Sequence, residues 1–160
     1  MGVDEEIEEA VRTHGWQFIS ISDNDPPFLY TVGFLPRHPE VIIFGLEPTK
    51  ASHLMNCIAQ QVKRNAPLEH KGVYDIEAQP GKIATRRVHP TQIPLHFGFA
   101  MGYCRLKGLG DVQAIQAFWP DTHGRFPFDV GCDLDVYRNQ PRLDIGLSPR
   151  EVANWERLWE

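Results

Sequence analysis

Apolar and polar residues follow one another along the first fifteen positions with the period of an amphipathic helix. Val3, Ile7 and Val11 fall on one face, and acidic residues occupy the opposite face. Acidic residues suit the positive N-terminal end of a helix, and Gly15 is a typical residue after a helix C-terminus. The pattern predicts a helix over residues 3–14.

Three β-rich segments follow in quick succession, over residues 16–22, 28–34 and 41–46. A turn cluster at 23–27 separates the first two, and the break at 36–39 separates the second from the third. The third segment begins Val-Ile-Ile-Phe without a polar residue, which is typical of a strand buried on both faces. Short spacers predict antiparallel neighbours, because parallel strands need a long crossover.

The middle of the chain alternates between helix and strand signals. Apolar residues at helical spacing predict a helix over 48–64, and β-rich stretches predict strands at 73–77, 83–88 and 112–119. Residues 94–103 are ambiguous, since large apolar residues alternate there as in a strand, whereas the proline that begins the segment suits the first turn of a helix.

The last helix carries the clearest local signals in the chain. Ser148 is placed as the N-cap, Pro149 as the first helical residue and Glu151 as the reciprocal partner of a capping box. One apolar side follows, made of Val152, Trp155, Leu158 and Trp159.

These elements predict an α+β fold with a mostly antiparallel sheet, packed with N-terminal, central and C-terminal helices. The chain has 160 residues, and its 42% hydrophobic and 23% charged residues are ordinary for a globular protein. Two domains of half this length would each be too small to bury a good core. We therefore expect a single domain over residues 1–160.

Charge argues against nucleic acid as a partner. The formal net charge is −5, and the densest basic cluster holds only Lys82, Arg86 and Arg87. Nucleic-acid binding usually requires a basic surplus or a basic stripe. The longest apolar run, residues 41–44, is also far shorter than the roughly 20 residues that span a bilayer. The sequence predicts neither a nucleic-acid nor a membrane partner.

The cysteines and the N-terminus predict a cytoplasmic location. Cys57, Cys104 and Cys132 are odd in number and too far apart for a CxxC motif, which favours reduced thiols in a reducing compartment. The acidic first ten residues do not have the pattern of a secretory or transit peptide.

Two loops carry the residues best suited to chemistry. His38 and Glu40 lie in the 37–40 loop, and Asp121 and His123 lie in the 119–124 loop. If these loops meet, His38, Asp121 and His123 would suit a zinc ion with an open position for water, and Glu40 would be the base. The alternative is structural, with Asp121 capping a turn.

A second group suits ligand binding without catalysis. Tyr30, Thr31 and Gly33 lie together on one predicted strand, where Gly33 either lets the backbone approach a ligand or marks a β-bulge. Trp119 either faces a ligand or fills the core. The sequence has no dinucleotide-binding glycine motif, phosphate-binding loop, GxSxG elbow or HExxH motif.

Three segments together resemble the bacterial family known as domain of unknown function 4262. They are residues 28–34 with 38–40 and 44–46, residues 116–128, and residues 140–143. This chain has Phe34 where the family commonly has Leu, and Phe128 where the family commonly has Trp; both changes keep an apolar side chain. The resemblance implies a helix at 94–103, and it carries no established activity.

The order of the first elements is also similar to the opening of the FMN-binding split-barrel flavoproteins, which implies at most a split-barrel-like sheet. We therefore predict a binding or accessory module for an unidentified small molecule or protein. The alternatives are a metal-dependent hydrolase that uses the 37–40 and 119–124 loops, or an FMN-binding protein.

Overall fold

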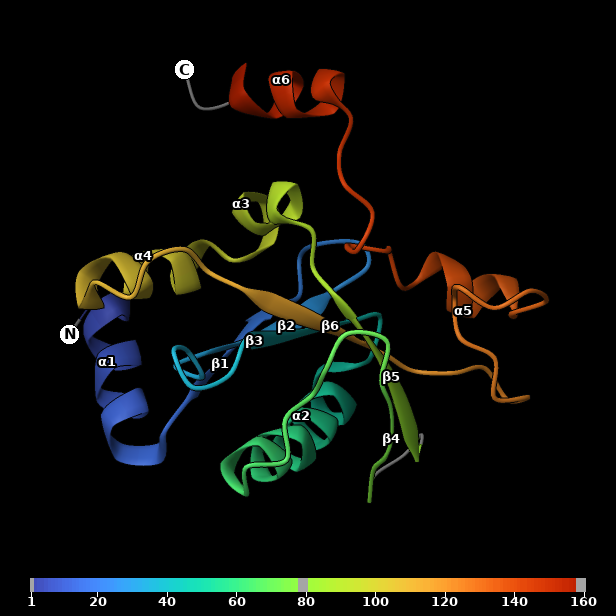
Figure 1. Ribbon diagram of the computed structural model, residues 1–160, viewed down its shortest axis with the longest axis horizontal. Coiled ribbons are helices and arrows are strands. Elements are labelled where there is room, and N and C mark those ends of the chain that lie inside the picture. Colours follow the sequence, from blue (N-terminus) through green and yellow to red (C-terminus); the bar gives the residue numbers. More distant parts are fainter. Residues whose placement is uncertain (1, 78–80, 158–160) are drawn as a thin grey trace.

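The sheet has six strands in the order β1-β2-β3-β6-β5-β4 (Figure 1). The computed structural model describes residues 2–77 and 81–157, with side chains to residue 154. The strands are β1 (Gln17–Ile21), β2 (Phe28–Val32), β3 (Glu40–Phe44), β4 (Val73–Asp75), β5 (Lys82–Arg87) and β6 (Ala114–Phe118). All six lie within or overlap the segments that the sequence predicts.

Four of the five strand pairs are antiparallel, and the β3–β6 pair is parallel. The antiparallel pairing of the first three strands confirms the prediction from their short spacers. Glu40 pairs with Ala114, and Ile42 pairs with Gln116. The parallel pair is allowed because the long connection between β3 and β6 contains a helix, a hairpin and three further short helices.

The sheet is open, so the split-barrel-like alternative does not describe it. β1 and β4 form its two edges, and among the described residues no pairing joins them. Strand order explains the difference, because β6 inserts between β3 and β5 and widens the sheet instead of closing it. A barrel would require the two edge strands to pair.

Helices cover both faces of the sheet (Figure 1). They are α1 (Val3–His14), α2 (Pro48–Lys63), η1 (Pro90–Gln92), α3 (Ile93–His96), α4 (Gly98–Lys107), α5 (Leu134–Arg138) and α6 (Pro149–Arg157). Residues 94–103 are helical except for Phe97, which separates α3 from α4; the family resemblance implies a helix there. The sequence pattern does not predict α5, which is five residues long and has no buried residue. Among the described helices, none combines the length and apolar composition needed to cross a membrane.

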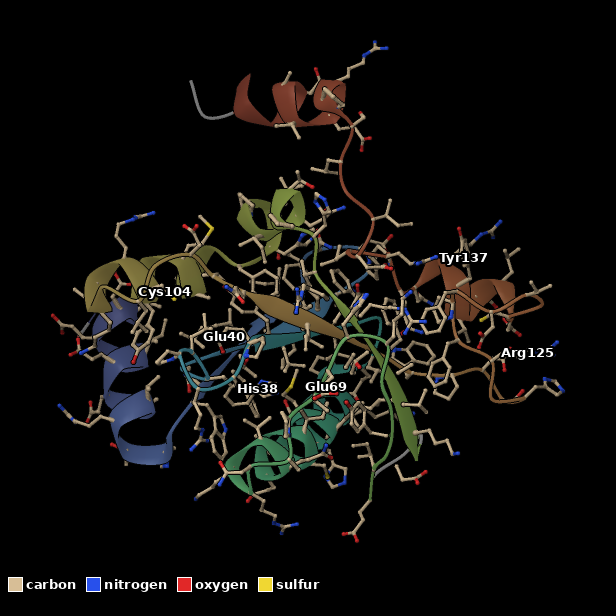
Figure 2. The ribbon with its side chains drawn as sticks, viewed as in Figure 1. His38, Glu40, Glu69, Cys104, Arg125 and Tyr137 are labelled. Atoms are coloured by element: carbon tan, nitrogen blue, oxygen red, sulfur yellow. The ribbon has the colours of Figure 1, made fainter. Side chains whose placement is uncertain are left out.

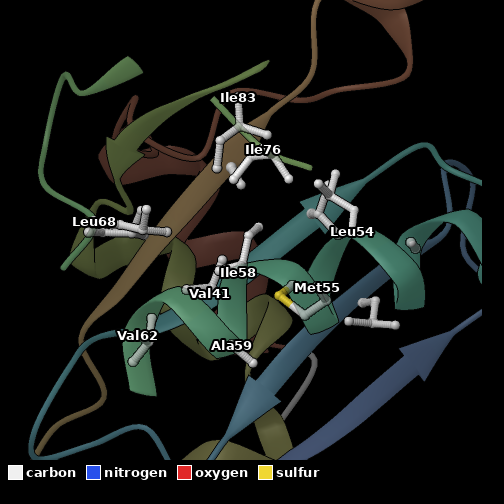
Figure 3. Packing of buried hydrophobic residues seen from close by; sticks show 14 of the residues in the cluster. Val41, Leu54, Met55, Ile58, Ala59, Val62, Leu68, Ile76 and Ile83 are labelled. Atoms are coloured by element: carbon white, nitrogen blue, oxygen red, sulfur yellow. The ribbon is translucent and has the colours of Figure 1, made fainter. Parts of the chain in front are cut away.

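Strand alternation gives the sheet two separate cores. Val41 and Ile43 face α2, where they pack with Leu54 and Ile58 (Figure 3). Ile42 belongs instead to the core on the face covered by α1, α3 and α4. β3 is completely buried on both faces, which is why its sequence has no polar alternation.

α1 lies against α4 at one end of the second core. Ile7 is buried there, and Lys107 of α4 donates to Glu8 of α1 at 2.6 Å. Gly15 ends α1 in the left-handed conformation, with φ of 96°, as its sequence position predicts.

The predicted capping box begins α6. The amide of Ser148 donates to Glu151 Oε1 at 3.1 Å, and the amide of Glu151 donates to Ser148 Oγ at 3.2 Å. Pro149 is the first helical residue. α6 stands away from the sheet instead of packing on it (Figure 1), and the side chain of Trp155 and residues 158–160 lie outside the described part of the chain.

Candidate functional site

The carboxylate of Glu40 lies in a cage of hydrogen-bond donors, at the point where β2 and β3 separate. The regular ladder between these strands stops at the pair Tyr30–Ile42. Beyond that pair, the Thr31 hydroxyl donates to Glu40 Oε1 at 2.8 Å and accepts from the Val41 amide at 2.9 Å. Hydrogen bonds of the Thr31 and Glu40 side chains thus connect β2 and β3 where backbone pairing between the two strands has ended.

Three consecutive amides complete the cage around Glu40. Phe34 donates to Oε1 at 3.1 Å, and Gly33 and Leu35 donate to Oε2 at 3.1 and 3.2 Å. Burial raises the pKa of Glu40 to about 7, and the four donors act in the opposite direction. Each carboxylate oxygen has two donors and the side chain has no exposed surface, so Glu40 fastens the β2–β3 turn.

His38 has both ring nitrogens engaged inside the protein. Nδ1 lies 2.6 Å from the Pro39 carbonyl oxygen, and Nε2 accepts from the Leu68 amide at 3.0 Å. A carbonyl can only accept and an amide N–H can only donate, so Nδ1 carries the proton and Nε2 supplies the lone pair. The lone pair that a metal would need is therefore already used, and His38 joins two segments 30 residues apart.

His38 should make the stability of the protein depend on pH. Burial lowers the pKa of His38 below its ordinary value of 6.5, so its contribution is present above that value and is lost as pH falls through the folded-state pKa. His38→Gln keeps an acceptor for the Leu68 amide but does not titrate. Urea unfolding between about pH 5 and pH 7 should show a steeper acid loss in the natural protein than in the variant.

Glu40 titrates in the same range in both proteins, so its contribution cancels in that comparison. Parallel pH profiles of the natural protein and the His38→Gln variant would contradict the role assigned to His38.

Asp121 organises the chain that follows β6. Its Oδ1 accepts from the amides of His123 and Arg125, and its Oδ2 accepts from the amide of Asp133, all at 2.9 Å. The amides of Arg125 and Asp133 hold the pKa of Asp121 below its ordinary value. The His123 side chain is exposed. The structural role of Asp121 that the sequence suggested, capping of a turn, matches these bonds.

The parallel pairing of β3 and β6 keeps the two predicted loops apart. His38 and Glu40 lie where β3 begins, whereas Asp121 and His123 follow the end of β6. Parallel strands begin at the same edge, so the loops are separated by a strand length, roughly 16 Å for five residues. Figure 2 shows His38 and Glu40 well away from Arg125, the residue that directly follows the second loop. Within residues 2–77 and 81–157, no group of three His, Cys, Asp or Glu could hold a metal ion.

The candidate ligand residues on β2 face the protein interior. Tyr30 is 1% exposed, and its hydroxyl accepts from the Phe99 amide at 3.0 Å, which ties β2 to the start of α4. Burial raises the pKa of Tyr30 to about 12. Thr31 belongs to the Glu40 cage. Gly33 has φ of 109°, and a Cβ there would lie 2.7 Å from a methyl carbon of Val11, so this position needs glycine to let α1 approach.

Trp119 and two buried glutamines hold the chain after β6 against the sheet. The Trp119 indole donates to the Phe44 carbonyl at 2.7 Å. The Gln140 amide group pairs with both backbone groups of Trp119, each at 2.9 Å. Gln116 donates to the Pro141 carbonyl at 2.7 Å and accepts from the Leu143 amide at 2.9 Å. These hydrogen bonds hold residues 140–143 against β6 and Trp119.

The structure contains an open groove that the sequence does not predict. Its volume is about 610 Å³, and it lies between α3, α4 and the loop that enters β6. We call it the α3–α4 groove; it is lined by Pro90, Ile93, Pro94, Met101, Cys104, Arg105, Gly108, Gly110, Asp111 and Val112. Leu95 and Phe99, on the same two helices, are 42% and 38% exposed.

One sequence feature is related to the surface of α3 and α4: large apolar residues alternate with other residues over 95–103. In a strand, these alternating apolar residues would all lie on one buried face. In the structure, two short helices joined at Phe97 point them in different directions. Phe97 is completely buried, whereas Leu95 and Phe99 are exposed. The Cys104 thiol is almost completely buried, and burial raises its pKa. A raised pKa makes a thiol a poor nucleophile at neutral pH.

Comparison with known proteins gives a family but no activity. The family described as "Domain of unknown function (DUF4262)" matches residues 10–133, which include all six strands and end before the 140–143 segment. No curated protein and no solved structure matches the chain. The match spans most of the chain, and this protein therefore belongs to the domain of unknown function 4262 family.

Proposed function

We propose that this protein is a binding module and that the α3–α4 groove binds an apolar, aromatic group of its ligand. The observation that carries the proposal is the groove itself, an open hollow of about 610 Å³ with mostly apolar lining. That volume is in the range of sites for small ligands or anchoring side chains, which commonly have an apolar lining and a few polar groups. Arg105 and Asp111 are the charged residues of this lining.

The lining favours an aromatic group over an aliphatic one. Met101 is a half-buried residue of the wall, and methionine sulfur makes favourable contacts with aromatic rings. An aromatic ring would bury a large area here at a low cost in conformational entropy.

The enzyme alternatives have less support than the groove. The hydrolase alternative joins residues at opposite ends of parallel strands, and its His38 and Glu40 are engaged in internal hydrogen bonds. The FMN alternative was based on the order of elements in a split barrel, whereas this sheet is open. We therefore propose the groove as the binding site.

Titration with indole tests this proposal. Amide chemical shifts in the full chain should change around Met101, Arg105 and Gly110 when indole is added to millimolar concentration. Met101→Arg places a charge in the apolar wall, so it should weaken indole binding by about tenfold or more.

Leu106→Arg is the matched control, because Leu106 lies on the same helix, is 60% exposed and does not line the groove. It should leave indole binding unchanged. Shifts spread evenly over the surface, or equal loss of binding in both variants, would show that the groove is not the site.

A further inference from the structure

The lining of the α3–α4 groove carries one positive and one negative side chain. Arg105 lies in the last turn of α4, and Asp111 lies in the connection that leads from α4 to β6 (Figure 1). The other lining residues are uncharged. Opposite charges therefore reach one largely apolar hollow from two different segments of the chain.

Neither of these charges is used by the protein itself. Lys107, two residues after Arg105, pairs with Glu8 at 2.6 Å. Among the described side chains, by contrast, no opposite charge lies within ion-pair distance of Arg105 or of Asp111. Both residues are exposed, so water solvates them while the groove is open. Because they do not pair with each other either, both are available to a ligand.

A ring that fills the groove would displace water from beside the two charged side chains. Removing water from a charge costs free energy unless an opposite charge or a hydrogen-bond partner takes its place. A neutral ring supplies no such partner, an aromatic acid would serve only Arg105, and an aromatic amine would serve only Asp111. The lining is matched best by a ligand that joins an aromatic ring to one carboxylate and one ammonium group.

The end of α4 supports the position of the ammonium group. Gly108, the C-cap residue of α4, lines the groove and has the left-handed conformation, with φ of 66°. The C-terminal end of a helix carries partial negative charge, which favours a cation, and Asp111 follows three residues later. The guanidinium of Arg105 suits the carboxylate, which it can bind through two parallel hydrogen bonds.

We propose that the ligand of the α3–α4 groove is a free aromatic α-amino acid. Its carboxylate would bind Arg105, its ammonium group would bind Asp111, and its ring would lie against the apolar wall that includes Met101. This inference rests on the proposed function and narrows it to one class of small molecule. An aromatic residue within a protein chain has neither charge, so it would use only the apolar wall.

Four indole compounds test the two charges separately. Indole has the ring alone, tryptamine adds the ammonium group, indole-3-propionate adds the carboxylate, and tryptophan has both. In titrations of the full chain, followed by the amide shifts of Met101 and Gly110, tryptophan should bind at least about tenfold more tightly than indole. Each singly charged compound should bind about threefold more weakly than tryptophan. Tryptophan that binds no better than indole would overturn the inference.

Two substitutions assign each charge of the ligand to its partner. Arg105→Gln should weaken tryptophan and indole-3-propionate by about threefold without weakening indole or tryptamine. Asp111→Asn should weaken tryptophan and tryptamine by a similar factor without weakening the other two. Equal effects on all four compounds would mean that these side chains do not contact the charged groups of the ligand.

Arg64→Gln and Asp23→Asn are the matched controls. Each removes the same charge from an exposed residue that does not line the groove. Both variants should bind tryptophan as the natural protein does. A loss in these controls equal to the loss in the groove variants would reduce the effect to the overall charge of the protein.

Two further compounds test the class of ligand. N-acetyltryptophanamide represents an aromatic residue within a protein chain, because both of its charges are blocked, and it should bind no more tightly than indole. If it binds as tightly as tryptophan, a free amino acid is rejected in favour of a segment of a partner protein. The D and L forms of tryptophan should differ in affinity by about threefold or more, since three contacts distinguish mirror images. Equal affinities would contradict the three contacts.

Indole keeps this inference apart from the proposed function. Indole shifts centred on the groove, without any gain from the charges of tryptophan, would uphold the groove as a binding site and reject the amino acid as its ligand. If neither indole nor tryptophan shifts the amides of the groove, both proposals fail.

Discussion

Replacing Glu40 by alanine is expected to lower the free energy of unfolding by on the order of 3–5 kcal/mol. The substitution leaves the amides of Gly33, Phe34 and Leu35 and the hydroxyl of Thr31 without their acceptor. Glu40 has no exposed surface, so water does not reach these donors without a rearrangement. Each buried donor without a partner costs about 1–3 kcal/mol, and the donors share one site, so the costs do not simply add.

Urea unfolding of three variants measures this effect. Glu40→Gln keeps one acceptor oxygen but turns an NH₂ group toward other donors, so its stability should fall between that of the natural protein and that of Glu40→Ala. Glu47→Ala is the control, because Glu47 also accepts from a backbone amide, that of Thr49, but at the exposed start of α2. Equal losses for Glu40→Ala and Glu47→Ala would mean that the donor cage contributes no special stability.

Replacing Gln116 by leucine should lower the free energy of unfolding by about 2–4 kcal/mol. Leucine is similar in size to glutamine, so the change mainly removes hydrogen bonds. The Pro141 carbonyl and the Leu143 amide then lose their partner in a region where Gln116 and Leu143 are almost completely buried. The 139–143 segment should also become more accessible, because Gln116 is one of the side chains that hold it to the sheet.

Gln113→Leu is the matched control, since Gln113 precedes β6 and its side chain is exposed. It should change stability by no more than about 0.5 kcal/mol. Hydrogen exchange adds a local measurement, in which the Leu143 amide should exchange faster in Gln116→Leu only. Slow exchange of that amide in the Gln116 variant would show that other contacts hold the segment.

Local chemistry in the sequence was enough to determine the helix ends and the buried strand. Gly15 ends α1 because a residue without Cβ adopts positive φ at low cost. Ser148 and Glu151 begin α6 because their side chains satisfy nearby amides. β3 is buried on both faces, as its unbroken apolar run predicts. Each of these signals acts within a few residues, so it can be recognised without knowing the fold.

The roles of the polar residues depended on the tertiary structure. His38 and Glu40 carry the groups that a metal site would use, and the sequence cannot show that the amides of residue 68 and of residues 33–35 already occupy them. For Asp121, the turn-capping alternative was visible, because its partners His123 and Arg125 are close in sequence. Its third partner, Asp133, is twelve residues away and was not predicted.

The sequence by itself determined the class of the fold, the elements of the sheet and the family, because periodicity and local motifs encode them. Only the tertiary structure decided that β6 pairs in parallel with β3, which places the 37–40 and 119–124 loops at opposite ends of the strands. It also decided that residues 93–107 form two short helices, which leave Leu95 and Phe99 exposed and form one wall of a groove. The physical reason is the same in both cases: strand partners and surface hollows depend on contacts between segments far apart in the chain, and no local pattern specifies them.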